Sequence, residues 1–587
     1  IATCIHEYLL QENITDYKTT LFKEATSFYS KPIFYLYSMD ISGIQDFIYT
    51  ITSKGALKGL RSRSFYLEIM MEHLIDSLLE KLFLSRVNLI YSGGGHAYIL
   101  LPNTEKVRKI VEDFEREVNE WFLEMFETQI YIAGGGAVCS ASDFWNEPEG
   151  SYREIFRNIS KEISFKKLHR YSPKQIIKLN HSGMPYGERD CSVCHRHNYL
   201  KDGETECEIC WALKQMSGNI LKGDFFTVTS KKEKTCLPLS GNCYLVTDTE
   251  STLRKRMKED KYYIRSYSKN KPYSGYYVST KLWVGDYVNG ETFEELGQRA
   301  TGIERIAVMR ADVDNLGQAF VRGFENEKNG SKYVTLSRTA TFSRKLSMFF
   351  KYHINSLLKE GGYSILEEEA QMEKEDDRRN ALIVYSGGDD IFIVGAWDDI
   401  IGFAVDLHDN LMEYSQDTLK ISARIGIYPS KYPISIMARE TGRLEEAAKS
   451  VEGKNAVALF DEKYTFPWEE FIENVVEEKL YFIQKYFKVV DEKGKNFLYN
   501  LLELVRKRKE DKINIARFAY LLGRMEPKVQ RGAKKEEIEE KRDLHREFSR
   551  KMYEWIRVEK DAKELEMAIY LYVYTKREKE EHDGVNE

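Results

Sequence analysis

Three aspartates in the second half of the chain have the types and spacing of a site for divalent cations. Asp389 and Asp390 stand side by side in YSGGDDIFIVG, and Asp312 lies near the end of IERIAVMRADV. Carboxylate oxygens bind hard cations such as Mg²⁺ or Mn²⁺, whose shells are completed by water and phosphate oxygens. Two cations held in this way activate a hydroxyl and stabilise a leaving pyrophosphate. Glycine and aspartate are also ordinary hairpin residues, so GGDD alone leaves a purely structural turn open.

Antiparallel strands are the elements that must bring these carboxylates together. Residues 304–312 are typical of a buried strand, and 381–396 of a hairpin. Antiparallel pairing of the two would place Asp312 near Asp389 or Asp390. Neighbouring strand residues face opposite sides, so one of these two aspartates can serve the cation while the other shapes the turn. Glycines in the turn allow a nucleotide to approach the backbone closely.

Other residues around these segments are candidate nucleotide contacts. Asp314 has a competing role as a turn former or helix cap. Two lysines in EEAAKSVEGKNAVALF are candidates for phosphate contacts or for a solvated helix end. The full candidate set is Ser386, Gly387, Gly388, Asp314, Asn315, Lys449 and Lys454.

The pattern of strands and helices occurs twice along the chain, as an internal repeat. In the first copy the strand-like segment IFYLYSM ends at Asp40, and YSGGGHAYILLP is the corresponding hairpin. Superposing the copies places Asp40 on Asp312, and Gly93-Gly94-Gly95-His96 on the GGDD turn. The first hairpin therefore lacks carboxylates, and we expect it to have lost the full metal site.

A separate set of cysteines has the spacing of a structural zinc site. Cys191-x-x-Cys194 and Cys207-x-x-Cys210 match paired zinc knuckles. In a reducing compartment such thiols bind Zn²⁺ more readily than they form disulfides. Four cysteines fill a tetrahedral site without His195 or His197, and a closed site of this kind stabilises a fold. We expect the remaining cysteines to be chemically inert: Cys4, Cys139, Cys236 and Cys243.

The composition of the chain limits its class. With 587 residues the chain is too long to fold around a single hydrophobic core. Its formal net charge of −6 argues against a free-standing, nonspecific nucleic-acid binder. No segment approaches the roughly 20 apolar residues of a membrane span, and the first residues do not resemble a signal peptide. We expect a cytoplasmic protein without a membrane partner. Lys58, Arg61 and Arg63 in LKGLRSRS are candidates for RNA or subunit contacts, or for a charged helix start.

These motifs resemble those of the palm-type cyclase and polymerase superfamily, which includes GGDEF diguanylate cyclases. That superfamily carries a first-strand aspartate, a GG[DE][DE] hairpin and an AK-x-x-G-[KR]-N segment, and Ala448-Lys449 through Gly453-Lys454-Asn455 is similar to the last of these. With its duplicated unit and cysteine insert, the chain resembles the large palm-domain subunit of type III CRISPR effector complexes, most closely the Csm (III-A) type. Characteristic segments are YSMDISGIQDFIYT, GLRSRSFYLEIM and YSGGGHAYILL.

The resemblance implies an α+β chain with two ferredoxin-like palm domains, a zinc-binding α/β insert and a helical C-terminal domain. It implies that target RNA activates synthesis of cyclic oligoadenylates from ATP, with metal ions at Asp312, Asp389 and Asp390. The first palm would hold the acceptor nucleotide through Gly94, Gly95 and His96, or serve only as structure. The implied partners are guide CRISPR RNA, target RNA and the other subunits of the complex.

Family members commonly begin with an HD nuclease domain. The pairs His408-Asp409 and His582-Asp583 lack a suitable context. We therefore expect a form without that domain, to which DNase activity is not transferred. The expected domains are a linker helix at 1–29, a first palm at 30–165, a zinc-binding linker at 166–298, a second palm at 299–465 and a helical domain at 466–587.

Two other functional classes compete with a nucleotidyltransferase. One is a catalytically silent scaffold that anchors the end of the guide RNA and keeps palm folds for their shape. The retention of clustered carboxylates beside glycines disfavours it. The other is a diguanylate cyclase, which the duplicated palm and the absence of an evident sensory domain disfavour.

Overall fold

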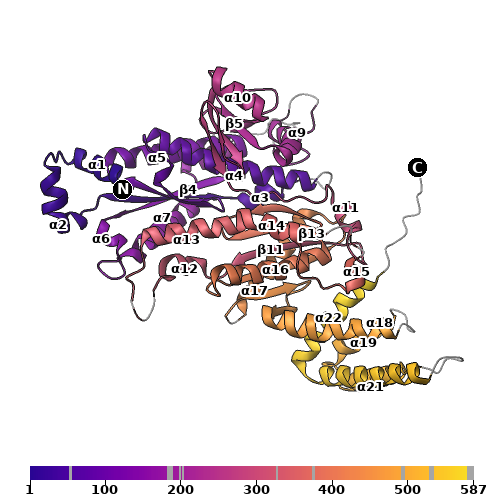
Figure 1. The fold of residues 1–587 in the computed structure, drawn as a ribbon. Coiled ribbons are helices and arrows are strands. Elements are labelled where there is room, and N and C mark those ends of the chain that lie inside the picture. The colour runs from indigo at the N-terminus through magenta and orange to yellow at the C-terminus, as the bar shows by residue number, and fades with distance from the viewer. Residues whose placement is uncertain are drawn as a thin grey trace.

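The fold of the chain is seen in a computed structural model, whose described part contains three β-sheets and a helical C-terminal region (Figure 1). The described residues are 1–51, 56–181, 190–196, 200, 204–325, 328, 330–372, 374, 377–451, 453–490, 496–527 and 535–577. We call the part with the first sheet the first unit, the part with the GGDD sheet the second unit, and the part between them the insert.

The first unit is a four-stranded antiparallel sheet of order β2-β3-β1-β4 with helices on both sides. Strand β1 pairs with β4 along its whole length and with β3 as far as Asp40, which makes it central and explains its apolar run. Helix α4 is buried on most of its surface because it packs against both the first unit and the insert. The elements are α1 (Ala2–Gln11), η1 (Thr19–Lys23), α2 (Ala25–Tyr29), β1 (Phe34–Ser42), α3 (Ile44–Tyr49), α4 (Ala56–Lys81), η2 (Arg86–Asn88), β2 (Leu89–Gly93), β3 (His96–Pro102), α5 (Glu105–Phe126), β4 (Tyr131–Cys139), α6 (Ala141–Phe144), α7 (Ser151–Leu168) and α8 (Pro173–His181).

The second unit repeats this strand order and extends it. Its sheet has the order β12-β13-β11-β14-β15-β16, so the central strand again pairs antiparallel with the second arm of a hairpin and with the fourth strand. The shared order confirms the internal repeat. The elements are α11 (Phe293–Gln298), β11 (Ile306–Val313), α12 (Leu316–Arg322), α13 (Leu336–Met348), η3 (Phe349–His353), α14 (Ile354–Glu360), α15 (Glu368–Met372), β12 (Ala381–Ser386), β13 (Asp390–Ala396), α16 (Trp397–Ser415), β14 (Ile421–Tyr428), α17 (Ile434–Ser450), β15 (Ala456–Leu459) and β16 (Thr465–Pro467).

The insert has a sheet of its own, of order β6-β7-β5-β8-β10-β9. Its helix α9 begins within the cysteine cluster, where Cys207 is the N-cap residue. The elements are α9 (Glu208–Lys222), β5 (Phe225–Thr229), β6 (Leu237–Leu239), β7 (Cys243–Asp248), α10 (Glu250–Glu259), β8 (Tyr263–Lys269), β9 (Tyr273–Ser274) and β10 (Val278–Leu282).

The C-terminal region is helical and shares a hydrophobic core with the second unit. One cluster of buried side chains contains Met309 of β11, Trp397 of α16 and Phe548 of the C-terminal helices. The indole of Trp468 donates a 2.8 Å hydrogen bond to the carbonyl of Ile421 in β14. None of the described helices is long and apolar enough to cross a bilayer. The elements are η4 (Glu470–Leu480), α18 (Tyr481–Val489), α19 (Asn496–Lys507), α20 (Ile513–Gly523), α21 (Lys535–Arg557) and α22 (Glu559–Lys576).

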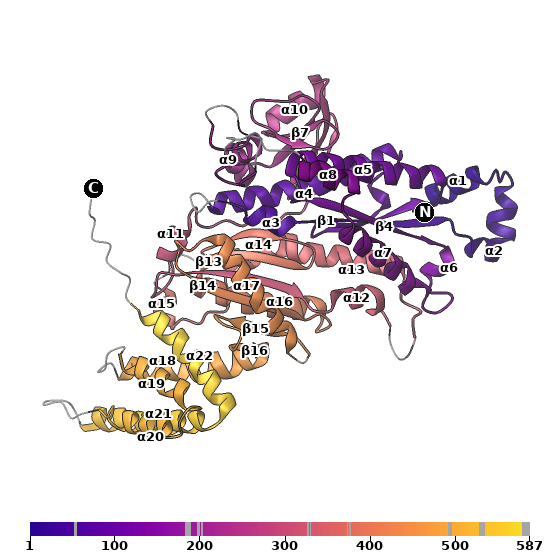
Figure 2. The ribbon, with the colours of Figure 1, turned by 180° about the vertical axis from the view of Figure 1, so that it is seen from behind.

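The four parts lie in a row. In both views the first and second units lie next to each other, the insert lies beyond the first unit, and the C-terminal helices lie beyond the second (Figures 1 and 2). The two hairpin turns meet where the units join, since a Cβ on Gly93 would lie 3.2 Å from the Cα of Gly388. This junction positions the candidate site.

Candidate functional site

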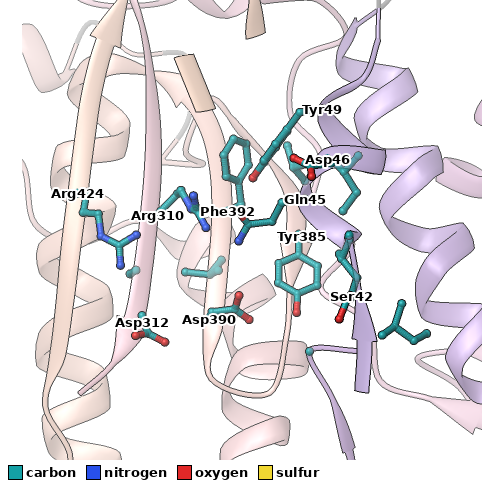
Figure 3. A pocket seen from close by; sticks show the side chains of 18 of the residues that line it. Ser42, Gln45, Asp46, Tyr49, Arg310, Asp312, Tyr385, Asp390, Phe392 and Arg424 are labelled. Atoms are coloured by element: carbon teal, nitrogen blue, oxygen red, sulfur yellow. The ribbon is translucent and has the colours of Figure 1, made fainter. Parts of the chain in front are cut away.

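The register of the second sheet places two of the three aspartates opposite each other. Asp312 of β11 pairs directly with Asp390, the first residue of β13. Figure 3 shows their carboxylates side by side on one face of the sheet. This confirms that antiparallel pairing brings Asp312 beside the GGDD turn.

Asp389 has a different orientation from Asp390. Its carbonyl accepts a hydrogen bond of 3.1 Å from the amide of Val313, and its Oδ1 lies 3.8 Å from the position of a Cβ built on Gly94 of the first unit. Among the described residues, only a set of cysteines brings three or more potential metal ligands within 4.8 Å of one another. The three aspartates therefore divide into an Asp312–Asp390 pair and an Asp389 that faces the first unit.

The Asp390 carboxylate has the properties of a ligand for a hard cation. Burial and the neighbouring Asp312 charge raise the pKa of Asp390 to about 6. Its Oδ1 is buried and has no hydrogen-bond partner in the described part of the chain, and a buried oxygen of that kind calls for an explanation. A divalent cation supplies both the missing partner and the opposing charge, so the residues present fit Mg²⁺ or Mn²⁺.

The raised pKa of Asp390 predicts how metal affinity depends on pH. Metal ligands must be deprotonated, and the folded protein holds the Asp390 proton up to a pH of about 6. We expect the apparent dissociation constant for Mn²⁺ to be nearly constant above pH 7 and to rise about tenfold for each pH unit below 6. Titration calorimetry with Mn²⁺ from pH 5 to pH 8 measures it. A dissociation constant that is constant down to pH 5 would contradict this role of Asp390.

A cavity of about 650 Å³ lies between the two units and contains the aspartate pair on one wall. The first unit contributes residues 41–46, Ile48 and Tyr49 together with Gly94, Lys167 and Arg170. The second unit contributes strand residues around Asp312 and Asp390. The ring centroids of Tyr49 and Phe392 lie 5.2 Å apart across the junction between the units. The cavity is therefore bounded by both units and opens beside both carboxylates (Figure 3).

Three arginines line this cavity, and the sequence analysis missed all of them: Arg170 of the first unit, and Arg310 and Arg424 of the second. Arg310 and Arg424 are direct partners across β11 and β14, and both line the cavity. Arg310 lies two residues before Asp312, so strand alternation places it on the same face. That spacing in MRADV was the available signal. Arg424 carried no comparable signal, because its strand had no recognised site residue.

The residues after β11 fix a loop of the second unit. The carboxylate of Asp314 is buried and accepts hydrogen bonds from the Ser422 hydroxyl at 2.9 Å and the Asn455 amide at 3.0 Å. The Nζ of Lys454 donates a 2.7 Å bond to Oδ1 of Asn315. None of these residues lines the cavity. Lys449 lies in α17, and its side chain falls outside the described part.

The YSGG residues of the two hairpins pack closely against each other. A Cβ on Gly388 would lie 2.3 Å from the Tyr91 hydroxyl, and a Cβ on Gly387 would lie 2.5 Å from the hydroxyl of Tyr385. Ser386 is buried and donates its hydroxyl to the carbonyl of Phe350 in η3. The glycines are therefore needed because tyrosine rings from both units pack against them. Nothing in the sequence indicated this packing.

In the first unit, the aspartate at the corresponding position is paired with basic residues of the same unit. Asp40 pairs with His96 in the register that Asp312 and Asp390 occupy in the second unit. Its carboxylate lies 3.2 Å from Nδ1 of His96 and 2.9 Å from Nζ of Lys167. Burial acts to raise the pKa of Asp40, but these two partners outweigh it and the pKa is lowered. Gly94 lines the shared cavity, whereas His96 does not.

The four cysteines of the insert converge. The sulfurs of Cys191, Cys194, Cys207 and Cys210 lie within 4.8 Å of one another and are buried. Hydrogen bonds among them lower the pKa of Cys194 and raise that of Cys207 to about 11. The cluster alone thus favours mixed thiolate and thiol, whereas a bound cation deprotonates all four. A four-sulfur set of this kind fits Zn²⁺.

Three other predictions have structural outcomes. Arg61 and Arg63 are 4% and 3% exposed, so the predicted contact of these two residues with RNA phosphates is wrong. Lys58 is exposed and pairs with Glu291 at 2.9 Å. His408 is bonded to Asp409 at 2.8 Å and stacks on Trp468, within a helix rather than a metal site. His582-Asp583 and His197 lie outside the described residues.

Family models match three parts of the chain. Residues 33–182 match the Csm1 subunit domain B, residues 305–458 match the Cas10/Cmr2 second palm domain, and residues 484–578 match the second helical domain of the CRISPR RNA silencing complex Cmr2 subunit. A palm domain of this class therefore carries the aspartate pair.

Curated relatives extend the match to nearly the whole chain. Proteins named CRISPR system single-strand-specific deoxyribonuclease Cas10/Csm1 (subtype III-A) are 44% identical in Mycobacterium tuberculosis and 40% in Enterococcus italicus. The alignments cover 99% and 98% of this chain, and 71% and 72% of those proteins. The chain belongs to the Cas10/Csm1 family of subtype III-A CRISPR systems.

Solved structures agree with the fold. A Csm1–Csm4 cassette in complex with cA4 matches with a TM-score of 0.67 at 23% identity, over 97% of this chain and 72% of that one. A cassette in complex with one ATP matches with a TM-score of 0.64 at 25% identity, over 91% of this chain and 70% of that one. These matches, together with the family models, establish the mixed α/β architecture with a helical C-terminal region.

Proposed function

We propose that the second unit converts ATP to cyclic oligoadenylates at the Asp312–Asp390 pair. The observation that carries this proposal is a buried carboxylate oxygen without a partner, opposite a second carboxylate, in a cavity bounded by both units. The relatives bound to cA4 and to ATP support the choice of substrate and product.

In the proposed reaction the 3′-oxygen of one ATP attacks the α-phosphorus of another. The bond from that phosphorus to the β-phosphate oxygen breaks, pyrophosphate leaves with the electron pair, and the hydroxyl proton passes to solvent. Asp312 and Asp390 would hold the divalent cations, which would supply charge stabilisation for this transfer. Tyr385 is no candidate base, because burial and the nearby aspartates raise its pKa well above the ordinary value.

The cavity residues of the protein position the nucleotides. Arg310 and Arg424 offer guanidinium donors that suit phosphate oxygens. The Tyr49–Phe392 contact supplies an aromatic wall on which a base can stack. Gly94 lines the same cavity from the first unit, which supports an acceptor nucleotide there. Since Asp40 is already paired with His96 and Lys167, we assign no metal to the first unit.

We further propose that both units are ferredoxin-like palms and that the insert is a zinc domain. The common strand order supports the first assignment, and the convergent sulfurs support the second. The domain limits remain those expected from the sequence, with breaks near residues 30, 166, 299 and 466. The other subunits of a III-A complex, guide RNA and target RNA are the proposed partners. A structure that matches this chain, a Csm1–Csm4 subcomplex of the type III-A CRISPR-Csm interference complex, supports them.

The test incubates the chain with radiolabelled ATP and Mn²⁺ or Mg²⁺, alone and assembled with partner subunits, guide RNA and target RNA. An Asp389→Ala/Asp390→Ala double variant is run beside it, and products are resolved by chromatography. Oligoadenylates made by the parent and lost in the variant support the proposal. If the fully assembled parent makes none, a silent scaffold that anchors the guide RNA is the better description.

The cavity arginines of the second unit give a prediction about substrate affinity. We expect Arg310→Met to raise the KM for ATP by about 10- to 100-fold, because a charge-assisted hydrogen bond contributes about 1.5–3 kcal/mol. Steady-state kinetics with ATP measures it. Arg305→Met is the control, since Arg305 precedes β11 and does not line the cavity. Equal KM values for the two variants would remove Arg310 from the substrate site.

A further inference from the structure

The cysteine cluster is bonded to two arginines that are themselves buried. The Nη2 of Arg63 donates to Sγ of Cys210 at 3.1 Å, and Nε of Arg196 donates to Sγ of Cys194 at 3.2 Å. Each of the two arginine residues is 3% exposed. The arginines come from different parts of the chain, since Arg63 belongs to α4 of the first unit and Arg196 lies beside the cysteines.

The charges of this cluster balance when zinc is bound. Four thiolates around Zn²⁺ carry a net charge of −2, and a buried charge is costly unless it is paired. Two guanidinium groups bonded to the sulfurs cancel that charge. The Cys210 sulfur, which Arg63 contacts at 3.1 Å, is an anionic partner for this buried arginine when zinc is bound.

Aromatic rings complete the arrangement. Arg63 lies 4.8 Å from the ring centroid of Phe47, and Arg196 lies 5.5 Å from that of Phe126. The two rings contact each other edge to face at 5.5 Å, and both are fully buried. Each arginine is therefore held between a sulfur and a ring, and the two halves are joined through the ring contact.

Arg63 also connects the cluster to the wall of the cavity. Its Nη1 donates a 3.0 Å hydrogen bond to the carbonyl of Phe47 in α3. The last carbonyls of a helix have no partner within that helix, and Phe47 lies in the last turn of α3. Most residues of this short helix line the cavity, and Tyr49 contacts Phe392 across it.

We propose that Arg63 is a positioning residue that balances the charge of the zinc–thiolate centre and, through the Phe47 carbonyl, holds α3 in the wall of the nucleotide cavity. The nucleotide part of this inference rests on the function proposed above. The zinc centre then contributes to the shape of a cavity that it does not touch. Loss of either zinc or Arg63 loosens the same six-residue helix.

The first test measures zinc retention in the full chain. Release of Zn²⁺ to a chromogenic chelator is followed in the parent and in Arg63→Met, Arg63→Lys and Lys58→Met. We expect release from Arg63→Met to be about 10- to 100-fold faster than from the parent, as for other partners of metal ligands. Arg63→Lys keeps the charge and should fall between. Lys58→Met, on the exposed face of the same helix, should match the parent. If Arg63→Met released Zn²⁺ at the rate of the parent, the proposed role of Arg63 in balancing the charge would be wrong.

The second test measures the helix itself by amide hydrogen exchange in residues 44–51. We expect exchange to rise at least tenfold in Arg63→Met and to the same level in parent protein stripped of zinc. Removing zinc from Arg63→Met should increase the exchange rate little further. If zinc and Arg63 acted independently, their effects on the exchange rate would add. If the stripped parent exchanges at the original rate, the coupling between zinc centre and cavity is absent.

Catalysis is measured separately, so that failure of this inference and failure of the proposed function are distinguishable. In Arg63→Met we expect the KM for ATP to rise several-fold while kcat changes less. Asp390→Asn should lose synthesis yet retain zinc and slow exchange. If no protein makes oligoadenylates but the zinc and exchange effects occur, the coupling stands and the proposed function fails. A KM unchanged in an otherwise active Arg63→Met removes the link to the nucleotide.

Discussion

Replacement of Asp390 by Asn is expected to lower oligoadenylate synthesis by at least about 10³-fold, because one ligand of a catalytic cation pair contributes several kcal/mol to the transition state. Asp389→Asn is expected to cost about tenfold or less. The difference follows from the structure, in which Asp390 faces Asp312 while Asp389 faces the turn of the first unit. Initial rates at saturating Mn²⁺ measure both. Equal losses in the two variants would contradict the separate roles.

The same substitution should stabilise the metal-free protein. The pKa of Asp390 is raised from 3.8 to about 6, so the folded state loses stability as the pH rises from about 4 through 6. Asparagine has no charge to desolvate, and we expect Asp390→Asn to be more stable than the parent at pH 7 by about 1–3 kcal/mol, with little difference at pH 4. Denaturant unfolding at both values of pH measures this. Asp409→Asn, which changes an exposed carboxylate of α16, is the control.

Replacement of Cys194 by Ser is expected to have the second large effect. Structural zinc binds with about 10–16 kcal/mol, so one ligand of four contributes about a quarter of that and its loss weakens zinc about 10²- to 10³-fold. Because the four sulfurs are buried against α4 and α5, the insert should become sensitive to protease when zinc leaves. Zinc content after dialysis and limited proteolysis measure the outcome.

Cys243→Ser is the matched control for that prediction. Cys243 belongs to the same insert but lies outside the convergent set. It should keep its zinc and its resistance to protease. A Cys194→Ser protein that retains a full equivalent of zinc would show that the fourth sulfur is dispensable.

Much of the candidate site was predictable because it depends on local patterns. The YSGGDD hairpin and the aspartate of RADV belong to strands that are short, continuous apolar runs. Antiparallel pairing of these strands is enough to place Asp312 beside the GGDD turn. The spacing of the cysteines was equally informative. The duplication was predictable because both copies keep the order of strand, hairpin and final strand.

The remainder depends on contacts between segments that are distant in sequence. Arg63 was interpreted as a surface residue because a basic helix start is usually solvated, whereas its actual partner is a cysteine 147 positions away. Arg424 faces the cavity only because β14 pairs with β11 in one register. Lys167 reaches Asp40 from the far end of α7. No local pattern encodes such partners, since each is set by the packing of whole elements.

The core that crosses from the second sheet into the C-terminal helices has a thermodynamic consequence. Met309 of β11 and Phe548 of α21 belong to one continuous apolar cluster, so the two regions should melt in one cooperative transition. A cavity made at Phe548 costs about 3–5 kcal/mol in a rigid core. It would then lower the free energy of unfolding of the strand that carries Asp312 by the same amount. The C-terminal helices thus help to stabilise the sheet that carries Asp312 and Asp390, and calorimetry of Phe548→Ala should show one lowered transition instead of two.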